Sequence, residues 1–181
     1  VSSHYNYRDH RKILVIDGKV AFNGGVNLGD EYINRTHPFG HWKDTAVMMK
    51  GEAARSFTLM FLQMWNITEE NAVFDPWIAE TGYVPQNPSG FVIPFGDCPL
   101  DEDKVGRAVY MDILNRATNY VHIMTPYLIL DDELQTAIIY AAQRGVEVEL
   151  FVSEQSDQFM VGHAQASYYR ELLEARVRIW L

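Results

Sequence analysis

The second half of the chain alternates strand patterns with helix patterns, and this alternation is the strongest constraint on the fold. Helical patterns at 102–118, 131–144 and 164–175 separate apolar segments that read as strands, and Gly145 is placed to end the second helix. The strand segments are SGFVIPFG, YVHIMTPY, VEVELFV and VRIWL. Because strands joined through helices pair in parallel, we predict an α/β fold with a mixed, mostly parallel sheet flanked by helices.

The first part of the chain predicts a β-hairpin that carries chemically active side chains. KILVI and VAF are apolar strand patterns on either side of an Asp-Gly pair, which favours a tight turn because both residues tolerate a positive φ. Alternate side chains of a strand share a face, so we expect His10 and Lys12 to project together toward one ligand.

A third strand, KDTAVMMKG, and a helix from Glu52 to Trp65 follow this hairpin. The apolar side chains of that helix recur at helical spacing and are predicted to be core; they are Phe57, Met60, Phe61, Met64 and Trp65. Proline and glycine interrupt the pattern farther on, which is typical of a connector. We therefore expect two structural parts, 1–68 and 91–181, joined by a connector at 69–90.

Composition excludes several classes of protein. A net charge of -9 argues against nucleic acid as a partner, although Arg8, Arg11 and Lys12 make the start of the chain locally basic and leave room for a phosphate site. The single cysteine, Cys98, cannot form an internal disulfide. No apolar run approaches the roughly 20 residues that span a bilayer, so we expect this segment to be soluble.

His10, Lys12 and Asp17 form the pattern His-x-Lys-x4-Asp, and a Gly-Gly-Val-Asn bend follows at 24–27. Imidazole can attack phosphorus or transfer a proton, and an ammonium group stabilises phosphoryl oxygens. Gly25 lets the backbone approach a ligand closely, and Asn27 offers an amide. The combination indicates phosphate chemistry.

Two carboxylates are candidates for a supporting role. A carboxylate beside the histidine would hold the imidazole in one tautomer and favour its cationic form, and Asp44 in HWKDT is our candidate for it. A surface carboxylate is the alternative for Asp44. Asp17 begins the Asp-Gly pair, so a structural role in the turn is its alternative.

The stretch HRKILVIDGKVAFNGGVN resembles the HxKxxxxD signature of the phospholipase D superfamily. Further segments are similar, in the same order, to bacterial cardiolipin synthases; they are NYRDHRKILVIDGKVAFNGGVNLGDEY, HWKDT, MTPYLILDDEL and YYRELLEARVRIW. The resemblance implies a bacterial membrane enzyme that condenses two phosphatidylglycerols into cardiolipin and glycerol through a phosphohistidine, without a metal or other cofactor.

Carried over by position, the resemblance implies that His10 is one of two catalytic histidines and that Lys12 and Asn27 contact the phosphate. It makes Asp17 the last residue of the signature and Asp44 the acidic partner of the histidine.

A second catalytic motif is expected outside this chain. His41 begins HWK but has Met48 at the aspartate position, and His163 has no lysine two residues later. His122 lies in an apolar strand pattern and is predicted to be buried and hydrogen-bonded. We therefore expect a fragment, inactive alone, with the C-terminal part of one catalytic unit in 1–68 and the N-terminal part of a second in 91–181.

Two other functions remain open at this point. A homodimer could pair one motif from each chain and act as a phospholipid hydrolase or a phosphodiesterase. Alternatively, the segment could be a scaffold that binds phosphate without turnover.

Overall fold

The computed structural model describes residues 9–67, 69, 73–78, 82–83, 90–97, 102–154 and 159–181. The chain divides into two compact units, Val1–Gly96 and Asp97–Leu181, and each is described by itself.

The first unit contains a three-stranded antiparallel sheet in the order β1-β2-β3. The strands are β1 (Lys12–Ile16), β2 (Val20–Gly24) and β3 (Ala46–Lys50). Asp17 and Gly18 have φ values of 52° and 63°, and the Lys19 amide donates to the Ile16 carbonyl at 3.0 Å. This geometry confirms the predicted Asp-Gly turn, because two successive positive φ values match the right-handed twist of a hairpin.

Helix α1 (Glu52–Trp65) packs its first half on this sheet, and a short 3₁₀ helix, η2 (Asp75–Trp77), follows it. The small core combines Ala54 and Phe57 of the helix with Ala21 of β2. The prediction that the whole apolar stripe is core was wrong, because Phe61 and Trp65 are 49% and 59% exposed. Three five-residue strands supply apolar partners for the first turns of the helix, whereas Phe61 and Trp65 lie outside this core cluster.

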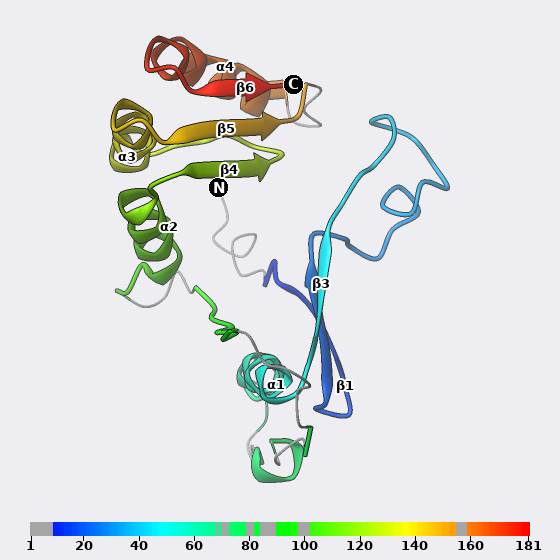
Figure 1. Cartoon of the computed structure of the whole chain (residues 1–181). Helices are drawn as coiled ribbons and strands as arrows, with labels where there is room; N and C mark the ends of the chain where they lie inside the picture. The colour runs from blue at the N-terminus through cyan, green and yellow to red at the C-terminus, as the bar shows by residue number, and fades with distance from the viewer. Residues whose placement is uncertain are drawn as a thin grey trace. The chain divides into compact units, whose positions relative to one another are not determined.

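The second unit contains a parallel sheet in the order β4-β5-β6, whose strands lie side by side in Figure 1. Its elements are α2 (Val105–Arg116), β4 (Tyr120–Thr125), α3 (Asp132–Gln143), β5 (Glu147–Val152), α4 (Phe159–Glu174) and β6 (Arg178–Trp180). This order confirms the predicted alternation, although α4 begins five residues earlier than expected.

The core of the second unit joins the three helices to the sheet. Its largest side chains come from each helix and from β5, and all are at most 1% exposed; they are Leu114, Ile138, Leu150 and Leu172. Asp131 caps α3, since its Oδ1 accepts from the Leu134 amide at 2.7 Å, and Gly145 ends that helix region with a φ of 91°.

The sheets differ from the predicted ones in two respects. The α/β class is confirmed, but the sheet of the first unit is antiparallel, so a mostly parallel sheet is not confirmed. The predicted strand SGFVIPFG was wrong for the described residues 90–97, which form no strand. Phe91 and Ile93 are 99% and 79% exposed there, and a short apolar run needs a neighbouring strand to become one itself.

Within the described residues, no helix combines the length and apolar character needed to cross a bilayer.

Candidate functional site

The register of the antiparallel sheet gathers the candidate residues at one of its ends. Lys12 pairs with Gly24, and Gly24 pairs with Ala46, so the start of β1, the end of β2 and the start of β3 form one row. His10 is two residues before Lys12, the glycine bend follows β2 at Gly25, and Asp44 is two residues before Ala46. The register therefore places Lys12, Gly25 and Asp44 at this end of the sheet, where the Gly25 amide donates to Asp44. His10 and Asn27 lie two and three residues from the row along the chain.

The sixth predicted site residue, Asp17, lies at the opposite end of the sheet. It begins the turn next to the row in which Ile16 pairs with Val20, and Val20 with Lys50. At about 3.3 Å per residue, five steps along β1 separate Asp17 from Lys12 by roughly 16 Å. The structure thus gives Asp17 a place in the turn, and a catalytic role for it stays a prediction.

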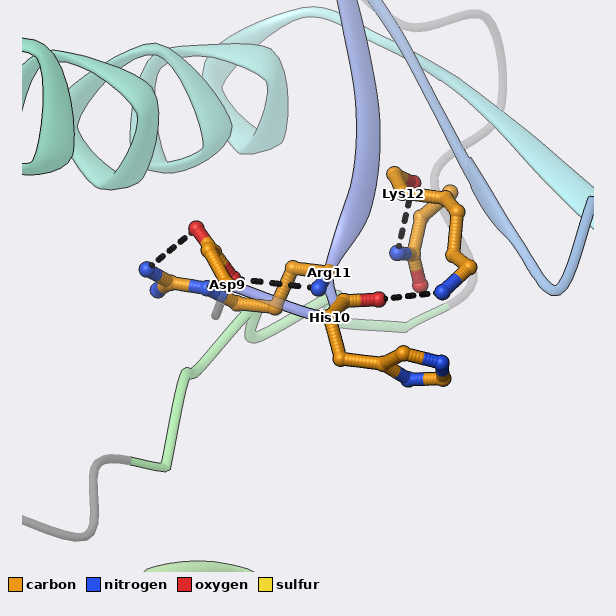
Figure 2. A network of polar contacts seen from close by, with 5 residues as sticks. Asp9, His10, Arg11 and Lys12 are labelled. Carbon is orange, nitrogen blue, oxygen red and sulfur yellow. Dashed lines mark hydrogen bonds and ion pairs between the residues drawn. The ribbon is translucent and has the colours of Figure 1, made fainter. Parts of the chain in front are cut away.

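His10 and Lys12 project from the same side of the chain, as strand alternation predicts (Figure 2). The His10 side chain is exposed, and Lys12 Nζ donates to the His10 carbonyl oxygen at 2.6 Å. An ammonium group has three N–H donors, so this contact leaves Lys12 with capacity to hold phosphoryl oxygens beside the imidazole.

Asp9 and Arg11 occupy the other side of the same stretch (Figure 2). Arg11 Nε and its second guanidinium nitrogen donate to the two Asp9 carboxylate oxygens at 2.8 and 3.0 Å. The hydrogen bond from the Arg11 side chain lowers the pKa of Asp9. The sequence suggested that the positive charge of Arg11 could help to bind phosphate. In the structure, the ion pair with Asp9 largely neutralises that charge. The pair lines a pocket of about 340 Å³ with Ile13 and the α1 side chains Met60, Phe61, Met64 and Trp65.

Asp44 is fixed by three N–H donors. Its Oδ1 accepts from the Gly25 amide at 3.2 Å and from the Thr45 amide at 2.7 Å, and its Oδ2 accepts from the Trp42 indole at 3.0 Å. Within the described residues, the Asp44 carboxylate is not hydrogen-bonded to His10. The proposed pairing of these two side chains stays a prediction, and the carboxylate has acceptor capacity left for an imidazole N–H.

Asn27 belongs to a neighbouring set of contacts that sequence reasoning missed. Its Nδ2 donates to the Tyr32 hydroxyl at 2.6 Å, and the Tyr32 ring packs edge-on against Trp42 with centroids 4.6 Å apart. Asn34 in turn holds the Trp42 backbone, accepting from its amide at 2.7 Å and donating to its carbonyl at 2.9 Å. Tyr32 and Trp42 are two of the three aromatic residues in this loop, and they were the available signal.

His122 has an environment different from the predicted one. It is 44% exposed rather than buried, and its Nε2 lies 3.5 Å from Glu147 and 3.7 Å from Glu149. Arg178 already donates to both carboxylates, at 2.8 and 2.7 Å. The ligand atoms of His122, Glu147 and Glu149 are close enough together to hold a metal ion. The guanidinium of Arg178 already supplies the positive charge beside both carboxylates, so we interpret the cluster as a network of ion pairs across β4, β5 and β6.

Comparison with known proteins finds similarity to cardiolipin synthases. Residues 110–181 match a family model described as "Cardiolipin synthase, PLD-like domain", in which PLD stands for phospholipase D. The cardiolipin synthase of Alkalihalophilus pseudofirmus is 36% identical over 175 residues, which are 97% of this chain and 35% of that protein. The chain is thus similar over nearly its whole length to bacterial cardiolipin synthases, and residues 110–181 are similar to a phospholipase D-like domain. The cardiolipin synthase of Geobacillus thermodenitrificans is 35% identical over 180 residues, which are 99% of this chain and 36% of that protein.

The match covers only part of each relative. An uncharacterized protein of Streptococcus mutans serotype c is 54% identical over 181 residues, 99% of this chain and 39% of that protein. The chain therefore spans between a third and two fifths of the length of these relatives. The similarity to cardiolipin synthases extends over both units, whereas the family model lies within the second unit alone.

Proposed function

We propose that this chain is part of a phosphatidyltransferase that condenses two phosphatidylglycerols into cardiolipin and glycerol. One observation carries the proposal: His10 and Lys12 project together at the sheet end where the glycine bend and Asp44 also lie. The proposal gains support from relatives along nearly the whole chain that are named cardiolipin synthases.

The proposed reaction uses two histidines in turn. One attacks phosphorus of the first phosphatidylglycerol, so that a nitrogen–phosphorus bond forms and the bond to the headgroup glycerol oxygen breaks. The other gives a proton to that oxygen, and glycerol leaves. It then takes a proton from a headgroup hydroxyl of the second phosphatidylglycerol, whose oxygen attacks phosphorus. The nitrogen–phosphorus bond breaks, the first histidine is regenerated and cardiolipin leaves.

This chain would supply one half of such a site. His10 is one of the two histidines, and Lys12 stabilises the negative charge on the phosphoryl oxygens. Asn27 and the Gly25 backbone contact the phosphate, while Asp44 orients the imidazole of His10. No metal or other cofactor takes part in any of these steps.

The second histidine would come from outside this chain. In-line displacement requires attacker and leaving group on opposite sides of phosphorus, and neither His41 nor His163 completes the motif. We assign residues 1–68 to the C-terminal part of a first catalytic unit and residues 91–181 to the N-terminal part of a second, with 69–90 as connector. The chain alone would then be inactive, and the full-length protein would act at the bacterial cell membrane.

Product analysis tests the proposed reaction. The full-length protein is incubated with phosphatidylglycerol vesicles, with and without EDTA, and lipids and glycerol are quantified. We expect cardiolipin and glycerol in equal amounts, unchanged by the chelator. Phosphatidic acid as the main product would instead indicate a hydrolase. The mass and the activity of this chain in solution test the homodimer alternative, because an active dimer that pairs two His10 motifs would contradict the claim that the chain alone is inactive.

A further inference from the structure

We propose that Trp42 is a positioning residue that fixes Asp44 and Asn27 relative to each other. The inference deepens the proposed function and rests on it for its kinetic test. The structural part of the inference is that the Trp42 indole holds the Asp44 carboxylate against the Gly25 amide. This part can be measured without the enzymatic reaction.

The Asp44 carboxylate owes its orientation to Trp42 more than to any other side chain. Two of its three donors are backbone amides, those of Gly25 and Thr45, and both contact Oδ1. The Trp42 indole is the donor to Oδ2 at 3.0 Å. A carboxylate bonded through one oxygen can still rotate about that contact, whereas donors on both oxygens fix its plane.

Trp42 can serve as a support because its own position is fixed from two directions. Asn34 makes a reciprocal pair of hydrogen bonds with the Trp42 backbone, at 2.7 and 2.9 Å. The indole ring also packs edge-on against Tyr32. Aromatic pairs of this geometry add roughly 0.5–1.5 kcal/mol beyond area burial.

The same ring links Asp44 to the phosphate-contacting amide. The Tyr32 hydroxyl that accepts from Asn27 belongs to the ring against which Trp42 packs. A continuous chain of contacts thus runs from Asp44 through Trp42 and Tyr32 to Asn27. Catalytic side chains need this kind of support, because small displacements of a reacting group cost large factors in rate.

Core packing does not account for this tryptophan. Trp42 is only partly buried and lies outside the core cluster of Ala21, Ala54 and Phe57. Its polar atom and both of its backbone groups are used within the loop that carries the candidate site residues. The arrangement favours a role in placing Asp44 over a role in holding the unit together.

The test is a double-mutant cycle in the full-length protein. Trp42→Phe keeps a ring to pack on Tyr32 but removes the N–H donor to Asp44. We expect kcat for cardiolipin formation to fall about tenfold with little change in KM for phosphatidylglycerol. In an Asp44→Asn background the same change should cost less than about twofold, because the group it positions is already altered. Trp77→Phe, at an exposed tryptophan of η2, is the matched control.

Hydrogen–deuterium exchange of the segment 24–27 provides the second readout. The Trp42→Phe variant should exchange faster there, since the acceptor of the Gly25 amide is no longer fixed on both oxygens. Unchanged exchange would overturn the inference whether or not the protein makes cardiolipin. Equal costs of Trp42→Phe in both backgrounds would also overturn it, because Trp42 would then act independently of Asp44. A wild-type protein that forms no cardiolipin would instead refute the proposed function.

Discussion

A Cβ atom added to Gly25 would lie 2.7 Å from each carboxylate oxygen of Asp44. Real Cβ atoms do not approach oxygen so closely, so a side chain at position 25 displaces the carboxylate. The Gly25 backbone φ is not in the left-handed region, so the constraint is steric rather than conformational. Gly25 and Asp44 therefore fit together only when position 25 has no side chain.

Gly25→Ala should separate these two residues. We expect a loss of about 1–3 kcal/mol in unfolding free energy, as for other overpacked sites, and a fall of about tenfold or more in turnover. Chemical denaturation and the cardiolipin assay measure the two effects. Gly90→Ala is the control, because nothing lies within 4 Å of a Cβ there and its φ is not positive; an equal loss in both variants would contradict the steric argument.

Lys12→Gln should reduce turnover by about 10²–10³-fold, the usual cost of removing one group that stabilises transition-state charge. The fold should be unaffected, because Lys12 is not buried and its ammonium group donates to an exposed carbonyl oxygen, that of His10. Steady-state kinetics of the full-length protein measure the effect. Lys50→Gln, at the turn end of the sheet, should retain normal rates, and equal losses in both variants would point to general surface charge instead.

The Asp9–Arg11 pair should make stability depend on acid pH. Because the Arg11 hydrogen bond lowers the pKa of Asp9, the pair stabilises the folded chain at neutral pH. The pair's contribution to the free energy of unfolding begins to fall at about pH 4, the usual pKa of an aspartate, and is lost once the pH has passed below the lowered pKa of Asp9. Unfolding measured across this range should show a smaller acid dependence for Asp9→Asn than for the wild type. Identical profiles would mean that the pair contributes nothing measurable.

The sequence was most informative where local chemistry decides the conformation. The Asp17-Gly18 turn follows from the φ values that these residues tolerate, and the parallel order of β4, β5 and β6 follows from their connection through helices. Prediction failed where distant partners decide. Residues 91–97 form no strand, and the apolar side chains at the end of α1 stay exposed because the helix pattern does not encode how many partners the small sheet offers.

The candidate site shows the same division. Strand alternation and register bring His10, Lys12 and Asp44 to one end of the sheet, and the motif spacing already indicated the first two. The links among Asn27, Tyr32, Trp42 and Asn34 depend on how a long loop folds back on itself. No periodicity marks such contacts; the aromatic residues of the loop were a signal that they exist, but their partners come from the structure.

His10→Ala tests the central claim most directly. In the full-length protein we expect cardiolipin formation to fall by about 10³-fold or more, since a catalytic histidine has no substitute, while the melting temperature stays unchanged because the side chain is exposed. His41→Ala is the matched control, an exposed histidine that also lies two residues before a lysine. A His10→Ala protein that kept near-normal rates would contradict the account.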